Sequence, residues 1–251
     1  PGQKVSNAAL INAALEHVEN VAPALGFGPN EKPEFVPDPF VKETSAGTRI
    51  VNLQQQYRGI PVFHMDRAVW FGPGGEIQNV TGTNVGLPPD LDTLPQVSLQ
   101  DAVNVAAVYM TSPSGRTDGW TRERLPEIRI DLTNFEPEIL GRISIPAQPA
   151  VVSKGPFGEN IPAHLVFFYQ GPTTRLGWHM VISTPNMEEQ YVIIVEADSQ
   201  TADKQKPQIL YAQKSSSEMA RARGNVWTHN PGIIPQREMV SFPRPVTEYP
   251  I

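Results

Sequence analysis

Two stretches in the first third of the chain alternate between hydrophobic and polar residues, the pattern of half-buried β-strands. The first covers residues 51–57 and the second covers 60–71. Arg58-Gly59 lies between them and supplies the glycine that a tight hairpin turn favours. The side chains expected on the apolar faces are Val51, Leu53, Tyr57, Phe63, Met65, Val69 and Phe71. Asn52, Gln54 and Gln56 are expected on the opposite, wet face of the first strand.

The hairpin is expected to continue into a three-stranded meander. The glycine-rich sequence 72–75 predicts a second turn, and 76–81 predicts a shorter third strand. A helix is predicted over 98–110, where Ser98 and Asp101 resemble a capping box. Its apolar stripe consists of Leu99, Ala102, Val103, Ala106, Ala107 and Met110. The simplest interpretation packs this helix on the meander.

Elements on either side of this unit follow weaker patterns. Residues 6–22 predict an amphipathic helix capped by Ser6, whose apolar face holds Ile11, Leu15 and Val18. The expected connectors are 27–47 and 111–126, and the expected further strands are 164–169, 175–182, 191–197 and 209–211, with some alternation in 127–144. Trp70, Trp178 and Tyr191 are expected in the core. The pattern as a whole predicts an α+β fold with two antiparallel sheet-plus-helix modules and extended proline-rich arms.

Composition narrows the class of protein. The chain has 251 residues, 39% hydrophobic and 18% charged, which is typical of a globular protein with a real core. Its net charge of -6 and the absence of a basic run argue against nucleic acid as a partner. No apolar run approaches the roughly 18 residues of a transmembrane segment. The sequence contains no cysteine, which excludes disulfides and cysteine-ligated metals.

The sequence 57–63, Tyr-Arg-Gly-Ile-Pro-Val-Phe, carries a family resemblance together with the Ile-Gln-Asn-Val-Thr-Gly strand and the helix that follow it. This block resembles the FTP module found in the propeptides of fungalysin- and thermolysin-type zinc metallopeptidases. Residues 175–181 and 191–198 resemble the PepSY-like half of such propeptides. The resemblance implies cystatin-like modules, a secreted or cell-surface location, and a segment that assists folding of a peptidase and inhibits it.

The resemblance and the patterns together suggest four divisions of the chain. These are an N-terminal helix and connector (1–47), an FTP-like module (48–112), a PepSY-like module (113–214) and an extended C-terminal arm (215–251). The arm is rich in proline, and its apolar residues follow no clear period. We expect such an arm to pack on its own chain or on a neighbour.

No catalytic motif is apparent, so we expect a protein without catalytic residues, cofactor or bound metal. The resembling peptidases need His-Glu-x-x-His on a helix, and the five histidines, at positions 17, 64, 164, 179 and 229, do not provide it. His64 and Asp66 share a strand face and could ligate a metal, although a half-exposed polar face is the simpler explanation. Glu188-Glu189 is expected to form a solvated turn. Asn79-Val80-Thr81 is a glycosylation triplet within a predicted strand, and we give it little weight.

Two classes of function remain open on the sequence alone. The first is a propeptide that serves as chaperone and inhibitor of a metallopeptidase domain, which the resemblance favours. The second is an extracellular structural subunit that assembles with further copies of itself through exchanged arms and edge strands. A stand-alone extracellular binding module is a third, weaker alternative.

Overall fold

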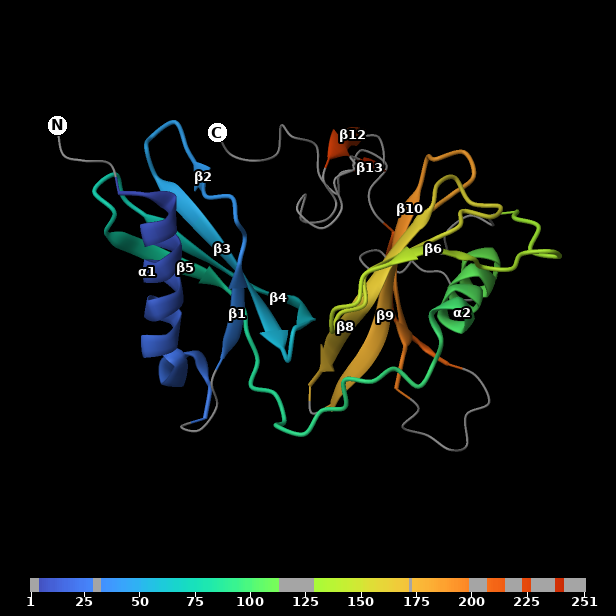
Figure 1. Ribbon diagram of the computed structural model, residues 1–251, viewed down its shortest axis with the longest axis horizontal. Coiled ribbons are helices and arrows are strands. Elements are labelled where there is room, and N and C mark those ends of the chain that lie inside the picture. The colour runs from blue at the N-terminus through green and yellow to red at the C-terminus, as the bar shows by residue number, and fades with distance from the viewer. Residues whose placement is uncertain are drawn as a thin grey trace. The chain divides into compact units, whose positions relative to one another are not determined.

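The computed structural model describes residues 5–28, 33–112, 129–171, 173–198 and 207–214, and the two short strands 223–226 and 238–241. This part of the chain is mixed α+β, with two α-helices and a predominance of β-sheet (Figure 1). It divides into two compact units. The first holds the described residues up to Thr93 together with 166–176, and the second holds 94–165 and the described residues from Gly177 onwards.

The first unit is built on the predicted meander. Its strands are β1 (Glu34–Pro37), β2 (Lys42–Glu43), β3 (Arg49–Tyr57), β4 (Ile60–Phe71) and β5 (Ile77–Gly82). β3 pairs antiparallel with β4, and β5 continues the sheet on the far side of β4. β1 and β2 pair with the other edge of β3, so the expected connector 27–47 contains two strands that the sequence pattern did not indicate.

The helix α1 (Asn7–Asn20) provides the core of the first unit (Figure 1). Ser6 caps it as predicted, because its hydroxyl accepts a hydrogen bond from the N–H of Ala9 (3.2 Å). A 3-10 turn (Ala22–Leu25) and the left-handed Gly26 end it. The buried stripe consists of Leu10, Ala14 and Val18, which pack on Val51, Leu53, Val69 and Phe71 of the sheet. Val18 is buried as predicted, but Ile11 and Leu15 are only partly buried beside this stripe, and Leu10 and Ala14 take their places.

The helix α2 (Leu99–Thr111) has the predicted extent and cap but not the predicted partner. Its N–H at Asp101 donates to the hydroxyl of Ser98 (3.1 Å), and all six side chains of the predicted stripe are buried. The helix belongs to the second unit, where it contacts β10 (Gln190–Glu196). The expectation that it covers the meander was wrong, since α1 occupies that face.

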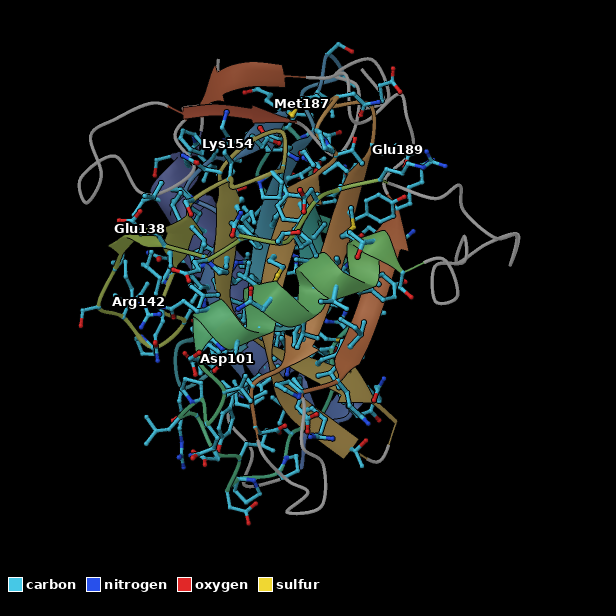
Figure 2. All side chains as sticks on the ribbon, turned by 90° about the vertical axis from the view of Figure 1, so that its right-hand side faces the viewer. Asp101, Glu138, Arg142, Lys154, Met187 and Glu189 are labelled. Atoms are coloured by element: carbon cyan, nitrogen blue, oxygen red, sulfur yellow. The ribbon has the colours of Figure 1, made fainter. Side chains whose placement is uncertain are left out.

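The second unit is an antiparallel sheet covered on one face by α2. The other strands of this sheet are β6 (Ile139–Arg142), β7 (Ala150–Val152), β8 (Ile161–Gln170), β9 (Thr173–Ser183) and β11 (Ile209–Lys214). The end of β8 and the start of β9, within residues 166–176, group with the first unit. The order runs from β6 through β7, β8, β9 and β10 to β11. Figure 2 shows α2 crossing the strands, with Asp101 in its first turn. The strands β8 and β9 contain the predicted strands 164–169 and 175–182, and β10 covers all but the last residue of the predicted 191–197. β7 was not predicted, and the described residues 129–144 form a strand only at 139–142.

The C-terminal region is described only at two strands. β12 (Arg223–Val226) and β13 (Glu238–Ser241) pair antiparallel. The rest of the predicted arm 215–251 lies outside the described residues, as do residues 113–126 of the predicted connector 111–126. Among the helices that the structure describes, none is long and apolar enough to cross a membrane.

Candidate functional site

The hairpin β3–β4 contains a bulge that changes which side chains face the core. Gln54 pairs with Asp66 and Gln56 pairs with Pro61, so residues 62–65 of β4 lie opposite Gln55 alone. Ile60 before the bulge and Val62 at its first position are fully buried, as are Val69 and Phe71 after it. The uninterrupted alternation predicted for this strand was therefore wrong at Phe63 and Met65, which are only partly buried.

The side chain of Gln54 fills the bulge and satisfies its main chain. Its amide nitrogen lies within hydrogen-bond distance of the carbonyl oxygens of Val62 (2.9 Å) and Met65 (3.0 Å), and of its neighbour Gln55 (3.0 Å). These carbonyls would otherwise lack the partners that a regular ladder provides. The amide of Gln54 thus holds the bulge in one conformation.

The neighbouring Gln55 attaches a following segment to the sheet. Its side-chain nitrogen donates to the carbonyl of Val85 (2.6 Å), and the N–H of Val85 donates to the side-chain oxygen Oε1 of Gln55 (3.0 Å). We call residues 83–89 the strap. Thr83 adds contacts to the main chain of β4, since its N–H donates to the carbonyl of Asp66 (2.9 Å) and its hydroxyl to that of His64 (3.1 Å).

A second group of contacts fixes the strap near the β3–β4 turn. Arg58 (φ 49°) and Gly59 (φ 78°) both have positive φ, the requirement of the type I′ turn that suits a two-residue hairpin. The N–H of Gly59 donates to Glu34 Oε1 of β1 (3.0 Å). The carbonyl of Pro89 accepts from the Tyr57 hydroxyl and from Arg58 Nη2 (3.1 Å). The predicted structural role of 57–62 in the turn thus extends to holding the strap.

The two residues considered for metal binding lie at this bulge. His64 has a left-handed backbone (φ 57°), and its ring stacks on that of Phe63 with centroids 3.8 Å apart. Partial desolvation lowers the pKa of His64, and the charge of nearby Asp66 opposes this shift. No group of three or more histidine, aspartate or glutamate side chains in the described ranges is arranged to hold a metal ion. His64 lies within the bulge and Asp66 directly follows it.

Other predicted residues lie apart from this site. His17 is in the last turn of α1, the rings of His164 and His179 lie 4.6 Å apart in the second unit, and His229 is outside the described residues. Trp178 and Tyr191 are 1% exposed, which confirms them as core residues. Trp70 is not: it pairs with Ile50 on the face away from α1, and its indole N–H donates to the hydroxyl of Thr81 (3.2 Å).

The acidic pair Glu188-Glu189 forms part of a polar turn between β9 and β10. Glu188 accepts a hydrogen bond from the amide of Asn186 (2.7 Å), and Glu189 accepts one from the Tyr191 hydroxyl (2.7 Å) and pairs with Lys214. The carboxylates are engaged in holding the turn (Figure 2 labels Glu189). This agrees with the predicted turn and corrects its description as merely solvated.

Sequence reasoning missed two polar residues of the first unit. Gln55 and Arg49 are 2% and 1% exposed and lie on the buried face of β3 with Val51 and Leu53. Their positions in the sequence could have revealed them. Arg49 lies two positions before Val51 and Gln55 lies two positions after Leu53, so the alternation of a strand places all four side chains on one face. Arg49 donates to the carbonyl of Val5, which anchors the chain just before α1. The hydrogen bonds that converge on residues 83–89 suit this site to holding a polypeptide segment in place.

Comparison with known families assigns a motif to this part of the chain. Residues 41–84 match the family model of the fungalysin/thermolysin propeptide motif, FTP. The matched residues comprise β2 to β5, the bulge, the β3–β4 turn and the first residues of the strap. The chain thus carries a propeptide motif, a non-catalytic element, as the sequence resemblance indicated. A comparison with curated proteins gave no match for the chain.

Proposed function

We propose that this protein acts as a propeptide-type partner of a secreted zinc metallopeptidase, assisting its folding and inhibiting it. The observation that carries the proposal is the FTP motif match, which falls on the braced meander of the first unit. A propeptide needs a fixed surface rather than catalytic groups. The hydrogen bonds of Gln54, Gln55 and Tyr57 supply such rigidity. We infer a secreted location from the same motif.

A candidate contact with the peptidase lies directly before the matched residues. Phe40 is 74% exposed, although it is held in place by a turn in which its N–H donates to Asp38 Oδ1 (2.9 Å). Val36 on β1 is 42% exposed. An exposed aromatic side chain on a main chain held by a hydrogen bond suits an anchor that fills a pocket of a partner. We assign Phe40 this role.

We also propose that the second unit is the PepSY-like half of the propeptide. The sequences 175–181 and 191–198, which carry that resemblance, fall largely on β9 and β10. Both strands are buried on the face that contains Trp178 and Tyr191. The suggested divisions at 48, 113 and 215 remain part of this proposal.

The test is inhibition and refolding of a metallopeptidase by the full chain. The probe is the catalytic domain that the gene encodes in frame after Ile251, if there is one. Otherwise one purified fungalysin-type and one thermolysin-type domain are used. We expect stoichiometric inhibition and an increased yield of active enzyme on dilution from denaturant. No effect on any of these domains would overturn the proposal.

Two matched substitutions test the contact itself. Phe40→Ala removes the proposed anchor, and we expect inhibition to weaken by about tenfold or more, as for an interface hot spot. Leu94→Ala removes a side chain that is similarly exposed, at 65%, but lies in the second unit. It should leave inhibition unchanged. Equal inhibition by both variants and the original chain would exclude Phe40 as the anchor while leaving the propeptide role in place.

A further inference from the structure

Strand β5 is an open edge of the first sheet. Among the described strands it pairs only with β4. Gln78, Asn79, Thr81 and Gly82 are exposed along it. In an edge strand, the main-chain N–H and C=O of alternate residues point away from the sheet and can pair with another strand.

The two edges of this sheet are protected differently. The edge formed by β1 and β2 carries Glu34, Pro37, Lys42 and Glu43, residue types that discourage further strand pairing. β5 has the sequence Ile-Gln-Asn-Val-Thr-Gly, with neither a charge nor a proline. The protection normally given to an edge strand is therefore present on one side of the sheet and missing on the other.

The hydrogen-bond register identifies which groups of β5 point outward. The N–H of Thr83 donates to Asp66, and Val80 lies three residues before Thr83, opposite Val69. Alternation along an antiparallel pair then directs the N–H and C=O of Val80 away from β4. The N–H of Val80 accordingly donates to the side-chain oxygen of its own neighbour, Asn79 (2.9 Å).

The outward groups of Val80 are self-complementary. If two copies of β5 meet antiparallel at a two-fold axis through Val80, the side chain of Asn79 releases the N–H of Val80. The two Val80 residues then exchange both main-chain hydrogen bonds. Asn79 then lies opposite Thr81 of the second copy, so that two polar side chains meet, and Gln78 lies opposite the small Gly82. Val80 packs at the margin of the α1 core, so the apolar faces of both sheets meet on the same side.

We propose that this protein forms a two-fold symmetric dimer through antiparallel pairing of β5 with β5 of a second copy, centred on Val80. The dimer joins the two meanders into one continuous sheet with α1 on the same face in each copy. The proposal does not depend on the propeptide role, because its evidence is the edge and register of β5. Its test is the association of the purified chain in the absence of any peptidase.

The absence of cysteine makes the register directly testable. Residues directly opposite each other in a hydrogen-bonded antiparallel pair have Cα atoms about 5.5 Å apart, within the roughly 4.4–6.8 Å that a disulfide spans. Val80→Cys introduces the only thiol, since the chain contains no cysteine. Under mild oxidation we expect efficient disulfide-linked dimers. The matched control is Val36→Cys, which places a thiol at an exposed position of the protected edge strand β1 and should cross-link far less.

Light scattering after gel filtration of the full chain tests association without a cross-link. The original chain should be a dimer. Val80→Pro removes the outward N–H but leaves the β4 ladder intact, and should weaken the dimer at least about tenfold. Val80→Ala also removes most of the valine side chain, but unlike Val80→Pro it keeps the main-chain N–H. This variant should therefore remain dimeric. Asn79→Lys adds a charge to the edge and provides a second route to a monomer, should the proline variant fail to fold.

Each contrary outcome rejects the proposal. A monomeric original chain at the highest attainable concentration would overturn it, as would dimers that survive both Val80→Pro and Asn79→Lys. Equal cross-linking of Val80→Cys and Val36→Cys would reject the register. If a metallopeptidase domain, rather than a second copy, protected the amides of β5 from hydrogen exchange, the edge would belong to that partner instead.

Discussion

The side-chain amide of Gln55 pairs with the main chain of Val85 through two hydrogen bonds, in the manner of a neighbouring strand. Its nitrogen donates to the Val85 carbonyl (2.6 Å), and the Val85 N–H donates to its oxygen (3.0 Å). Gln55 is 2% exposed, so these bonds are shielded from water. A single side chain thus extends the sheet to the strap, residues 83–89, which has no regular strand structure of its own.

Replacing Gln55 by alanine should destabilise the first unit. The substitution removes two hydrogen bonds from a buried position, with an expected loss of about 1–3 kcal/mol in the free energy of unfolding. Urea unfolding of the full chain measures this loss. Gln56→Ala is the matched control, because it makes the same chemical change on the opposite, partly exposed face of β3. Equal losses for the two variants would show that the Val85 pairing contributes nothing.

The assignment of α1 to the meander predicts a large effect of Leu10. This side chain is 1% exposed and lies in the cluster with Val51, Leu53 and Phe71. Leu10→Ala should cost about 2–4 kcal/mol, the usual range for a buried leucine truncated to alanine. Leu15→Ala, at a partly buried position of the same helix, should cost clearly less. Hydrogen exchange should then show weaker protection of β3 in the Leu10 variant, and unchanged protection would argue against this packing.

Local patterns predicted the elements well because their signals are contained in short stretches. The predicted strand 60–71 coincides with β4, and Ser98 caps α2 as expected. Ser6 likewise caps α1. Each of these depends on residues within a few positions of one another, such as a serine hydroxyl and the N–H three residues later.

The errors concern relationships between distant residues. Both helices have an apolar stripe, and neither stripe records which sheet it covers, so α2 was placed on the wrong unit. The bulge at 62–65 inverts the phase of β4, yet the amide that satisfies its main chain, that of Gln54, is on another strand. The attachment of the strap could not be predicted for the same reason. The role of Gln55 depends on Val85, which lies 30 residues further along the chain.

The position of His64 predicts a pH dependence of stability. Desolvation lowers its pKa in the folded state below the usual 6.5, despite the opposing charge of Asp66. The unfolded chain therefore binds a proton more readily, and this contribution to stability is complete above about pH 6.5 and is lost as the pH falls toward the folded-state value. The effect should be small, because His64 is more than a third exposed.

The variant His64→Asn isolates this contribution. Asparagine tolerates the left-handed backbone at this position (φ 57°) and does not titrate. Urea unfolding at about pH 7.5 and about pH 5, on either side of the histidine pKa, should show that the original chain loses more stability than the variant. An equal or larger loss in the variant would mean that His64 is not a source of the acid sensitivity.

Gly177 should be intolerant of even a methyl group. A Cβ built there would lie 2.5 Å from Cγ2 of Ile194 on the adjacent strand and 3.2 Å from the carbonyl oxygen of Val195. In a strand, alanine is normally favoured over glycine by about 0.5–1 kcal/mol. Overpacking should reverse that preference, so Gly177→Ala is expected to destabilise the second unit by about 1–3 kcal/mol.

Gly141→Ala in β6 is the matched control, since a Cβ there meets nothing within 4 Å, and it should be neutral or slightly stabilising. Thermal unfolding of both variants measures the contrast, and a Gly177 variant as stable as the Gly141 variant would show that β10 moves aside without cost.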